Sequence, residues 1–224
     1  NYIINIKGFV PLPYIITQPA LGGFGGALAP LLITPKKRPA GYKGYIPPDI
    51  TAGFGMYTAN NSWAAGGGRI GSFPSKGIKY RIFAAYADVN LSYYHQFDMI
   101  GEKELKFNIE AAPVFLSISK KINRQNVYLG VQYLYSKNVL KPVFKEPVPD
   151  FISSKELDSK IGTMGTFLDF DNRNTIFTPN KGVNAHLLYT FNDNWTGSDY
   201  KFQELSGFVN GFIPIKPKWV CGLH

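Results

Sequence analysis

The segment that decides the fold runs from Asp171-Asn172-Arg173-Asn174 through Phe177-Thr178-Pro179-Asn180-Lys181-Gly182 into Val183–Phe191. A strand ends here, a turn rich in Pro, Asn and Gly follows, and a second strand begins. In this second strand, apolar and aromatic side chains occupy every other position, and mostly polar ones lie between them. Such two-residue alternation is typical of a β-strand with one apolar and one wet face.

The composition of the chain fits the same pattern. Its 224 residues are 45% hydrophobic and 15% aromatic, which excludes a disordered tail. The charged fraction of 17% is below the roughly 25% of soluble domains. No apolar run approaches the roughly 20 residues that a spanning helix needs. If the chain crosses a bilayer, it must therefore do so as strands of a closed barrel.

Charge and cysteine content exclude other classes. The formal charge is +9, but most of the Lys and Arg residues lie in expected turns, so we expect no nucleic-acid partner. Solvated loops account for them most simply, and contact with anionic lipid headgroups is the second explanation. The single cysteine, Cys221, excludes an internal disulfide framework.

Gly and Pro interrupt the sequence often enough to predict an all-β chain, an antiparallel meander of about ten or eleven strands. One expected pair, within Ile78–Phe97, has only a weak turn at Ala87-Asp88 and is equally consistent with one long strand. The expected strands are Phe24–Ile33, Ile50–Ala59, Trp63–Gly71, Ile78–Ala87, Val89–Phe97, Leu105–Ile118, Asn126–Tyr135, Lys160–Phe170, Val183–Phe191, Phe202–Phe212 and Trp219–Leu223.

Aromatic residues at strand ends favour a membrane barrel over a soluble sandwich, because membrane barrels carry interfacial girdles of aromatic residues. The residues concerned are Trp63, Tyr133, Tyr135, Tyr189, Phe191 and Trp219.

The expected connections also differ in length. If Ile78–Phe97 is a hairpin, the long loops Thr34–Asp49, Gln96–Glu104, Ser136–Ser159 and Asn192–Lys201 share one side of the sheet, with Ser72–Gly77 as a short exception. The other short turns and Asn172–Gly182 share the opposite side, as in outer-membrane barrels.

The spacing Asp171-x-Arg173-(x5)-Pro179-x-Lys181-Gly182, after a strand containing Gly162 and Gly165, resembles the signature of the bacterial surface antigen family. These are the BamA/TamA-like outer-membrane barrels. Two further segments are similar to the entry and middle strands of that family, namely Pro11–Gly26 and Tyr86–Tyr94.

The resemblance implies an outer-membrane β-barrel in a bacterial cell, with residues 24–224 as an incomplete barrel and 1–23 as the segment leading into it. It implies contact with outer-membrane lipids and a role in folding or inserting other outer-membrane proteins, with their unfolded chains as partners. The family's weak lateral seam would then correspond to the expected first strand, at Phe24, Gly25, Gly26 and Pro30.

The chain also departs from the family pattern. Asn174 replaces the second Asp of the signature, no late Arg-containing loop motif is found, and His224 is not the aromatic last residue that is usual there. We therefore interpret the chain as part of a barrel.

Two interpretations of the signature remain open. Asp169, Asp171 and Arg173 share strand parity, so they would form an ion-pair cluster in the barrel interior if the strand persists. Alternatively, Asp171 caps the strand end and the chain bends at Asn172–Asn174. Pro179, Lys181 and Gly182 are most simply a turn.

We expect no catalysis, no cofactor and no metal. Gly66–Gly71 matches a nucleotide-binding glycine pattern, but Ser72-Phe73-Pro74 cannot open the helix that such a site needs, so these glycines more simply relieve crowding in a strand. The histidines lack metal-ligand spacing. The alternatives to an assembly factor are a passive pore or structural barrel, and a secreted soluble β-sandwich that binds carbohydrate through Trp63, Trp195 and tyrosines.

Overall fold

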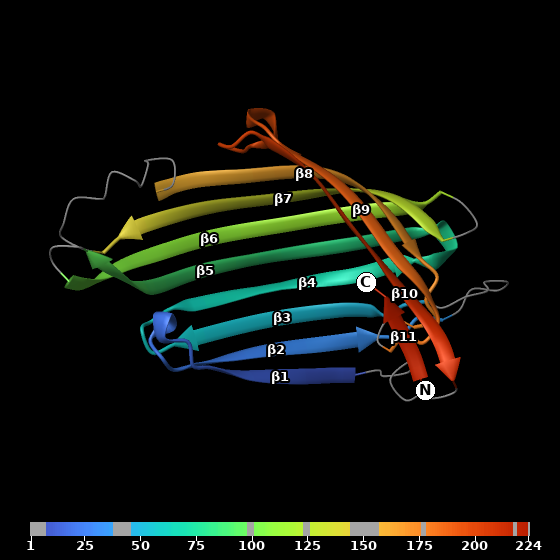
Figure 1. Ribbon diagram of the computed structural model, residues 1–224, viewed down its shortest axis with the longest axis horizontal. Coiled ribbons are helices and arrows are strands. Elements are labelled where there is room, and N and C mark those ends of the chain that lie inside the picture. Colours follow the sequence, from blue (N-terminus) through green and yellow to red (C-terminus); the bar gives the residue numbers. More distant parts are fainter. Residues whose placement is uncertain are drawn as a thin grey trace.

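The computed structural model describes residues 8–37, 46–97, 101–122, 126–143, 157–175, 178–216 and 219–223. They form one antiparallel sheet of eleven strands, each bonded to its neighbours in sequence (Figure 1). The predicted fold class is therefore confirmed. The strands are β1 (Gly8–Ile16), β2 (Gly25–Thr34), β3 (Asp49–Thr58), β4 (Trp63–Phe73), β5 (Ile78–Phe97), β6 (Gly101–Lys121), β7 (Val127–Pro142), β8 (Asp158–Asp171), β9 (Gly182–Asn192), β10 (Phe202–Lys216) and β11 (Trp219–Leu223).

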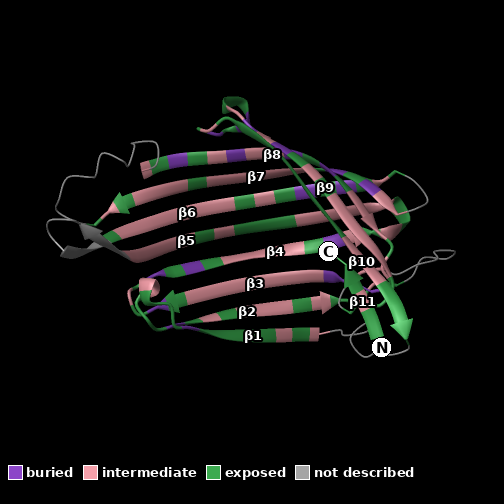
Figure 2. Cartoon of the chain, in the orientation of Figure 1, coloured by how far each residue is buried: buried purple, intermediate pink, exposed green. Residues whose placement is uncertain are grey.

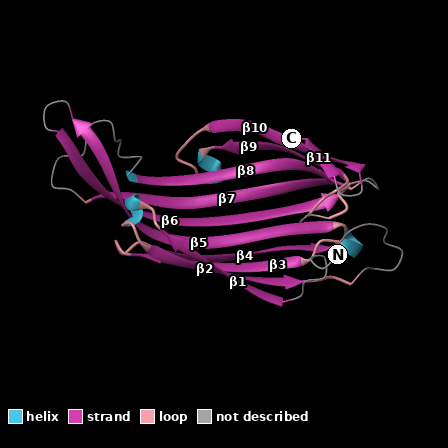
Figure 3. Ribbon diagram, turned by 60° about the horizontal axis from the view of Figure 1, so that its bottom comes forward, coloured by secondary structure: helices cyan, strands magenta, loops and turns pink. Residues whose placement is uncertain are grey.

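The sheet twists strongly across its width, so that β9–β11 run obliquely to β1–β7 in Figure 1. Within the described residues, β1 and β11 do not pair with each other, and the sheet is an open curved wall. Three short 3-10 turns, η2 (Pro19–Leu21), η3 (Pro74–Lys76) and η4 (Asn194–Thr196), lie in the connections between strands (Figure 3). The described residues form one curved sheet, without the second sheet packed face to face on it that a β-sandwich has.

Strand β1 was not predicted, and it lies inside the segment expected to lead into the barrel; residues 1–7 of that segment lie outside the described chain. Pro11 and Pro13 argue against a strand in the sequence, because proline has no backbone N–H to donate to a neighbouring strand. The β1–β2 register nevertheless continues through both residues. Alternate residues of an antiparallel strand bond to opposite sides, so both prolines fit where their nitrogens face the free edge.

Residues 78–97 form the one long strand β5, so the division into two strands is wrong. Ala87, Asp88 and Val89 pair in unbroken register with Ala111, Glu110 and Ile109 of β6, which leaves no turn there. Losing one turn moves every earlier connection to the opposite side of the sheet. The loop before Asp49 therefore lies with the short turns at one end of the sheet, as Ser72–Gly77 also does, and Asn60–Ser62 lies at the opposite end. The sidedness predicted for these three connections is wrong.

We call the two ends of the sheet the short-turn end and the long-loop end. The short-turn end holds η3, the turn before Val127 and the turn 172–181; the long-loop end holds the connections after β5, β7 and β9. Of the predicted long loop Ser136–Ser159, residues 144–156 lie outside the described chain, and the rest belongs mainly to β7 and β8.

The two faces of the sheet differ in chemistry, as the alternation predicts. One face, which we call the outer face, exposes aliphatic side chains in rows that follow the strand register: Leu32, Ile82, Leu116, Ile118, Leu129, Val131, Leu168 and Leu187 are all exposed. The opposite, concave face carries most of the buried strand side chains, including Ser117, Ser119, Tyr128 and Phe167. Figure 2 shows that most of the wall is only partly buried, as expected of a single layer.

The glycines of β4 make room for aromatic rings on the concave face. A Cβ atom on Gly66 would lie 2.6 Å from the Phe54 ring and from the Ala85 methyl group. The Phe54 and Phe83 rings stack with centroids 6.2 Å apart. Gly66–Gly71 is thus part of a strand, and the predicted relief of crowding is confirmed.

A methyl group at Gly66 should therefore destabilise the sheet. We expect Gly66→Ala to lower the free energy of unfolding by roughly 1–3 kcal/mol, because overpacking forces the Phe54 ring and the neighbouring backbone apart. Gly55→Ala is the matched control, because a Cβ there meets open space. Denaturant titrations followed by circular dichroism test the difference; equal losses in the two variants would contradict this packing.

Candidate functional site

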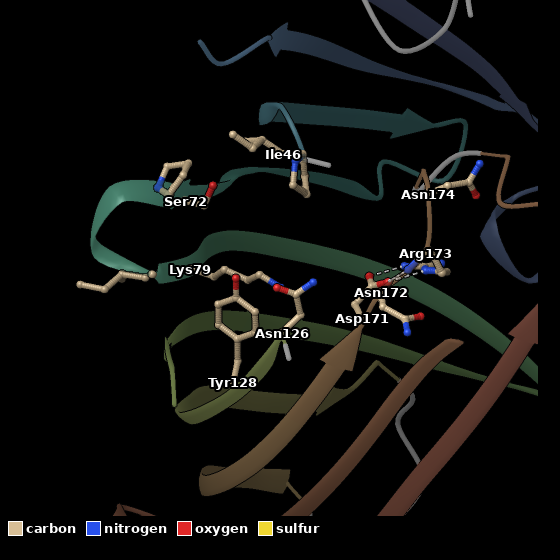
Figure 4. A pocket seen from close by; sticks show the side chains of 13 residues that line it. Ile46, Ser72, Lys79, Asn126, Tyr128, Asp171, Asn172, Arg173 and Asn174 are labelled. Atoms are coloured by element: carbon tan, nitrogen blue, oxygen red, sulfur yellow. Dashed lines mark hydrogen bonds and ion pairs between the residues drawn. The ribbon is translucent and has the colours of Figure 1, made fainter. Parts of the chain in front are cut away.

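Two adjoining cavities open on the concave face at the short-turn end. The first encloses about 360 Å³ and is lined by Ser72 and Lys79, by Tyr128 of β7 and by the turn Asp171–Asn174 (Figure 4). The second encloses about 310 Å³ and reaches further along the wall. Its lining adds Arg81, Ser117, Ser119 and Asp169. We call these two cavities together the basal cleft.

The turn after β8 places an ion pair at the mouth of the basal cleft. Arg173 donates from Nε to Asp171 Oδ1 over 2.9 Å and from Nη2 to Oδ2 over 2.8 Å. The Arg173 backbone N–H also donates to Oδ1. Hydrogen bonding to Asp171 raises the pKa of Arg173. A two-pronged Arg–carboxylate contact fixes direction as well as charge, so Asp171 holds the turn against the wall.

Asparagine side chains complete this turn. The Asn172 side chain accepts from the Val183 N–H over 2.6 Å, and Asn174 accepts from the N–H groups of Asn180 and Lys181. Asn174 also donates its amide N–H to the Asn180 side chain over 2.7 Å. A carboxylate has no N–H to donate, so Asn174 makes a contact here that the second Asp of the family signature could not.

Cations on the concave face rest on aromatic rings. Lys79 Nζ lies 3.7 Å from the centroid of the Tyr128 ring. Arg81 donates to Ser117 Oγ over 3.2 Å, and its guanidinium lies 5.3 Å from the Phe167 centroid. These contacts keep positive charge on a face that also carries Asp169 and Asp171, and they leave the cleft polar but nearly balanced.

Asp169 has a partner that the sequence did not indicate. His186 on β9 lies directly opposite it, with Nδ1 2.5 Å from Asp169 Oδ1. The imidazole ring lies between Phe167 and Phe208, with each centroid 5.6 Å away. The expectation that the histidines lack metal-ligand spacing did not address this contact, because the two residues are 17 apart in sequence and only strand register brings them together.

Both interpretations of the signature are thus partly realised. Asp169 and Asp171 share the concave face, as the cluster hypothesis requires, but Arg173 lies beyond the strand end and pairs locally, as the turn hypothesis requires. Gly182 has φ 112°, and a Cβ there would lie 2.8 Å from the Arg173 Cα, so the expected turn glycine is confirmed. Pro179 and Lys181 lie in the turn and do not line the basal cleft.

The predicted seam is wrong in one respect. Gly25, Gly26 and Pro30 lie on β2, which pairs with β1 on one side and β3 on the other, so β2 is not an edge strand. Phe24 precedes it. The missing N–H of Pro30 does have an effect, because the β2–β3 register has no pair between Leu28 and Leu31.

Most of the predicted interfacial aromatics lie on the outer face toward the long-loop end. Trp63 packs on Tyr86 with centroids 5.4 Å apart, and Phe191 packs on Trp195 at 5.2 Å. Tyr133, Tyr135, Tyr189 and Phe191 occupy outer-face positions by register, whereas Trp219 begins β11 at the opposite end. Tyr135 does not end its strand, because β7 continues to Pro142.

Beyond this aromatic row, the wall becomes polar. Asp88 accepts from Asn108, which also donates to Asn90, and Lys141 pairs with Glu110. Nearby, Asp193 caps η4 and pairs with Lys201, and these contacts lower the pKa of the Asp193 carboxyl, Lys201 making the larger contribution. The aromatic residues therefore mark a change of environment along the strands.

The described residues hold no group of three or more His, Cys, Asp or Glu side chains placed to bind a metal ion. In the described part of the chain, no helix is both long and apolar enough to span a membrane. No family model, no curated protein and no solved structure matches the chain.

The Asp171–Arg173 contact predicts a measurable stability difference. Arg173→Ala should lower the free energy of unfolding by roughly 1–2 kcal/mol, because it leaves a partly buried carboxylate without its partner. Lys181→Ala removes an exposed cation from the same turn and should change it by less than about 0.5 kcal/mol. Thermal and denaturant unfolding measure both variants; equal effects would mean that the ion pair does not hold the turn.

Proposed function

We propose that this chain forms the wall of an outer-membrane-type β-barrel in a bacterial cell. The observation that carries the proposal is the row of exposed aliphatic side chains on the outer face, including Ile82, Leu116, Val131 and Leu168. Soluble monomers rarely expose contiguous apolar surface of this extent, whereas acyl chains would cover it.

The concave face supports the same proposal. Strand by strand, the positions between the aliphatic residues carry Lys79, Arg81, Ser117, Ser119 and Gln132, which suit an enclosed aqueous interior. The described hydrophobic residues that are buried are few, namely Ile16, Ala64, Tyr128 and Phe167. A sheet without a core must obtain its stabilisation from what covers its apolar face.

Within the barrel class, we favour an assembly role over a passive pore. Pro47 and the turn at Arg173 both line the basal cleft, so two connections lie against the concave face and narrow the interior at the short-turn end. The Asp171–Gly182 signature is folded as a built turn, in keeping with the surface antigen resemblance. Unfolded outer-membrane proteins are the partners that this role requires, and no chemistry is catalysed in it.

A matched pair of neighbouring substitutions tests the membrane proposal. Val131→Lys places a charge on the outer face, and Gln132→Lys places it on the concave face one residue away. In a barrel, we expect the first to cost roughly 2–4 kcal/mol of stability in lipid and the second far less. Urea titrations of liposome-reconstituted full-length protein, with intrinsic tryptophan fluorescence as the signal, measure both. A larger loss from Gln132→Lys would reverse the faces and refute the proposal.

The assembly role has a separate test. Liposomes that contain the full-length protein should accelerate the folding of a urea-denatured small membrane barrel, scored by its heat-modifiable mobility on gels. Liposomes that contain an unrelated barrel of similar size are the control. A steady open-channel conductance in planar bilayers, together with no acceleration of folding, would instead support the passive pore.

A further inference from the structure

A charged cluster on the outer face remains unexplained by the barrel wall itself. Arg69 on β4 lies on the outer face, because it pairs with Thr51 on one side and with Ile82 on the other. A charge facing lipid at mid-depth is costly, but close to the interface the cost falls to roughly 0–1 kcal/mol. Arg69 lies six residues after Trp63 on the same strand face, or roughly 20 Å along the strand, and β4 ends at Phe73, so Arg69 lies toward the short-turn end of this strand.

The cluster has a defined geometry. Arg69 donates from Nη2 to Asp49 Oδ2 over 3.0 Å, from Nε to Tyr80 Oη over 2.9 Å and from Nη1 to Thr51 Oγ1 over 3.3 Å. Lys36 Nζ lies 2.8 Å from the other Asp49 oxygen, Oδ1. Two cations thus share one carboxylate, so the cluster as a whole carries one positive charge.

The exposed charge in this cluster is that of Arg69, since the Lys36 side chain is only 17% exposed. The Asp49 side chain is 10% exposed, whereas that of Arg69 is 41% exposed. A guanidinium has five N–H groups, and each terminal nitrogen of Arg69 uses one of its two in the contacts above, so N–H donors remain for a further acceptor. A planar fork of this kind suits the oxygens of a phosphate group.

The surroundings are those of a bilayer interface. The Phe73 and Tyr80 rings pack with their centroids 5.5 Å apart, and Lys36 Nζ lies 5.7 Å from the centre of the Phe73 ring. The exposed aliphatic residue Ile82 pairs directly with Arg69 on the neighbouring strand. The charge balance of the short-turn end is also one-sided. Its described carboxylates other than Asp49 are Asp169 and Asp171, on the concave face, whereas its basic residues outside the basal cleft include Lys36, Lys37, Arg69, Lys76, Lys120, Lys181 and Lys216.

We propose that Lys36, Arg69 and Tyr80, held together by Asp49, bind the phosphate of an anionic phospholipid headgroup in the leaflet at the short-turn end. The acyl chains of that lipid would lie along the aliphatic rows that start at Leu32 and Ile82. This inference rests on the proposed membrane barrel. It adds a specific lipid contact that anchors the depth of the wall in the bilayer.

The test measures how lipid type affects stability. Full-length protein is reconstituted in nanodiscs of phosphatidylcholine with increasing fractions of phosphatidylglycerol, and the unfolding midpoint and the lipid retained in native mass spectrometry are recorded. Phosphatidylglycerol should raise the midpoint, and removing charges should weaken its retention by roughly fivefold for each cation lost in Lys36→Gln and Arg69→Gln. Arg69→Lys should restore part of the effect.

Lys141→Gln is the matched control, because it removes an ion-paired outer-face cation at the long-loop end. It should leave the phosphatidylglycerol effect unchanged. Each variant is compared with itself in pure phosphatidylcholine, so a general loss of stability does not imitate the expected result.

Three outcomes would overturn the inference. The first is that phosphatidylglycerol stabilises the double variant Lys36→Gln/Arg69→Gln as much as the unchanged protein. The second is that Lys141→Gln reduces the phosphatidylglycerol effect as much as the Lys36 and Arg69 substitutions do. The third is that soluble glycerophosphoglycerol stabilises the detergent-solubilised protein equally, which would assign the site to free phosphate esters. Protein that stays folded in plain buffer and does not enter nanodiscs would instead refute the membrane barrel itself.

Discussion

The structure depends on one constraint, namely that a single sheet without a second layer presents both of its faces to a surrounding medium. Pairing between neighbouring strands satisfies the backbone N–H and C=O groups, but it buries little apolar surface. Stability must therefore come from a match between each face and what covers it. The described chain meets this constraint with rows of exposed aliphatic side chains on the outer face and with serines, ion pairs, ring-stacked cations and a group of aromatic rings on the concave face.

The same constraint explains where charges are tolerated. On the strands that carry the outer-face aliphatic rows, Asp169, Lys79 and Arg81 all lie on the concave face. There they contact a residue on a neighbouring strand or an aromatic ring. The outer-face charges described above lie toward the two ends of the wall. Asp88, Glu110 and Lys141 lie past the aromatic row at the long-loop end, and Arg69 with Asp49 lies at the short-turn end. The outer face thus carries its aliphatic rows between two groups of charged residues.

The turn after β8 joins the wall to its interior. Asp171 ends a strand and also holds Arg173 by two hydrogen bonds, so the turn bends toward the basal cleft instead of extending away from the sheet. Asn172 and Asn174 then bond the returning segment, and Gly182 supplies the backbone conformation that begins β9. The signature forms the predicted turn, and Asp171 in it also belongs to the charged groups of the concave face.

The sequence by itself determined the fold class, most strand positions and the chemistry of the two faces, because two-residue alternation is a local property that survives any tertiary arrangement. It did not reveal β1, whose prolines are acceptable only where they face a free edge, or the continuity of β5, whose weak turn signal gives way to pairing with β6. The contacts Asp169–His186, Lys79–Tyr128 and Arg69–Asp49–Tyr80 were decided by tertiary structure alone. Each contact joins residues on different strands. Which side chains meet is set by the register between strands, and the sequence of one strand does not define that register.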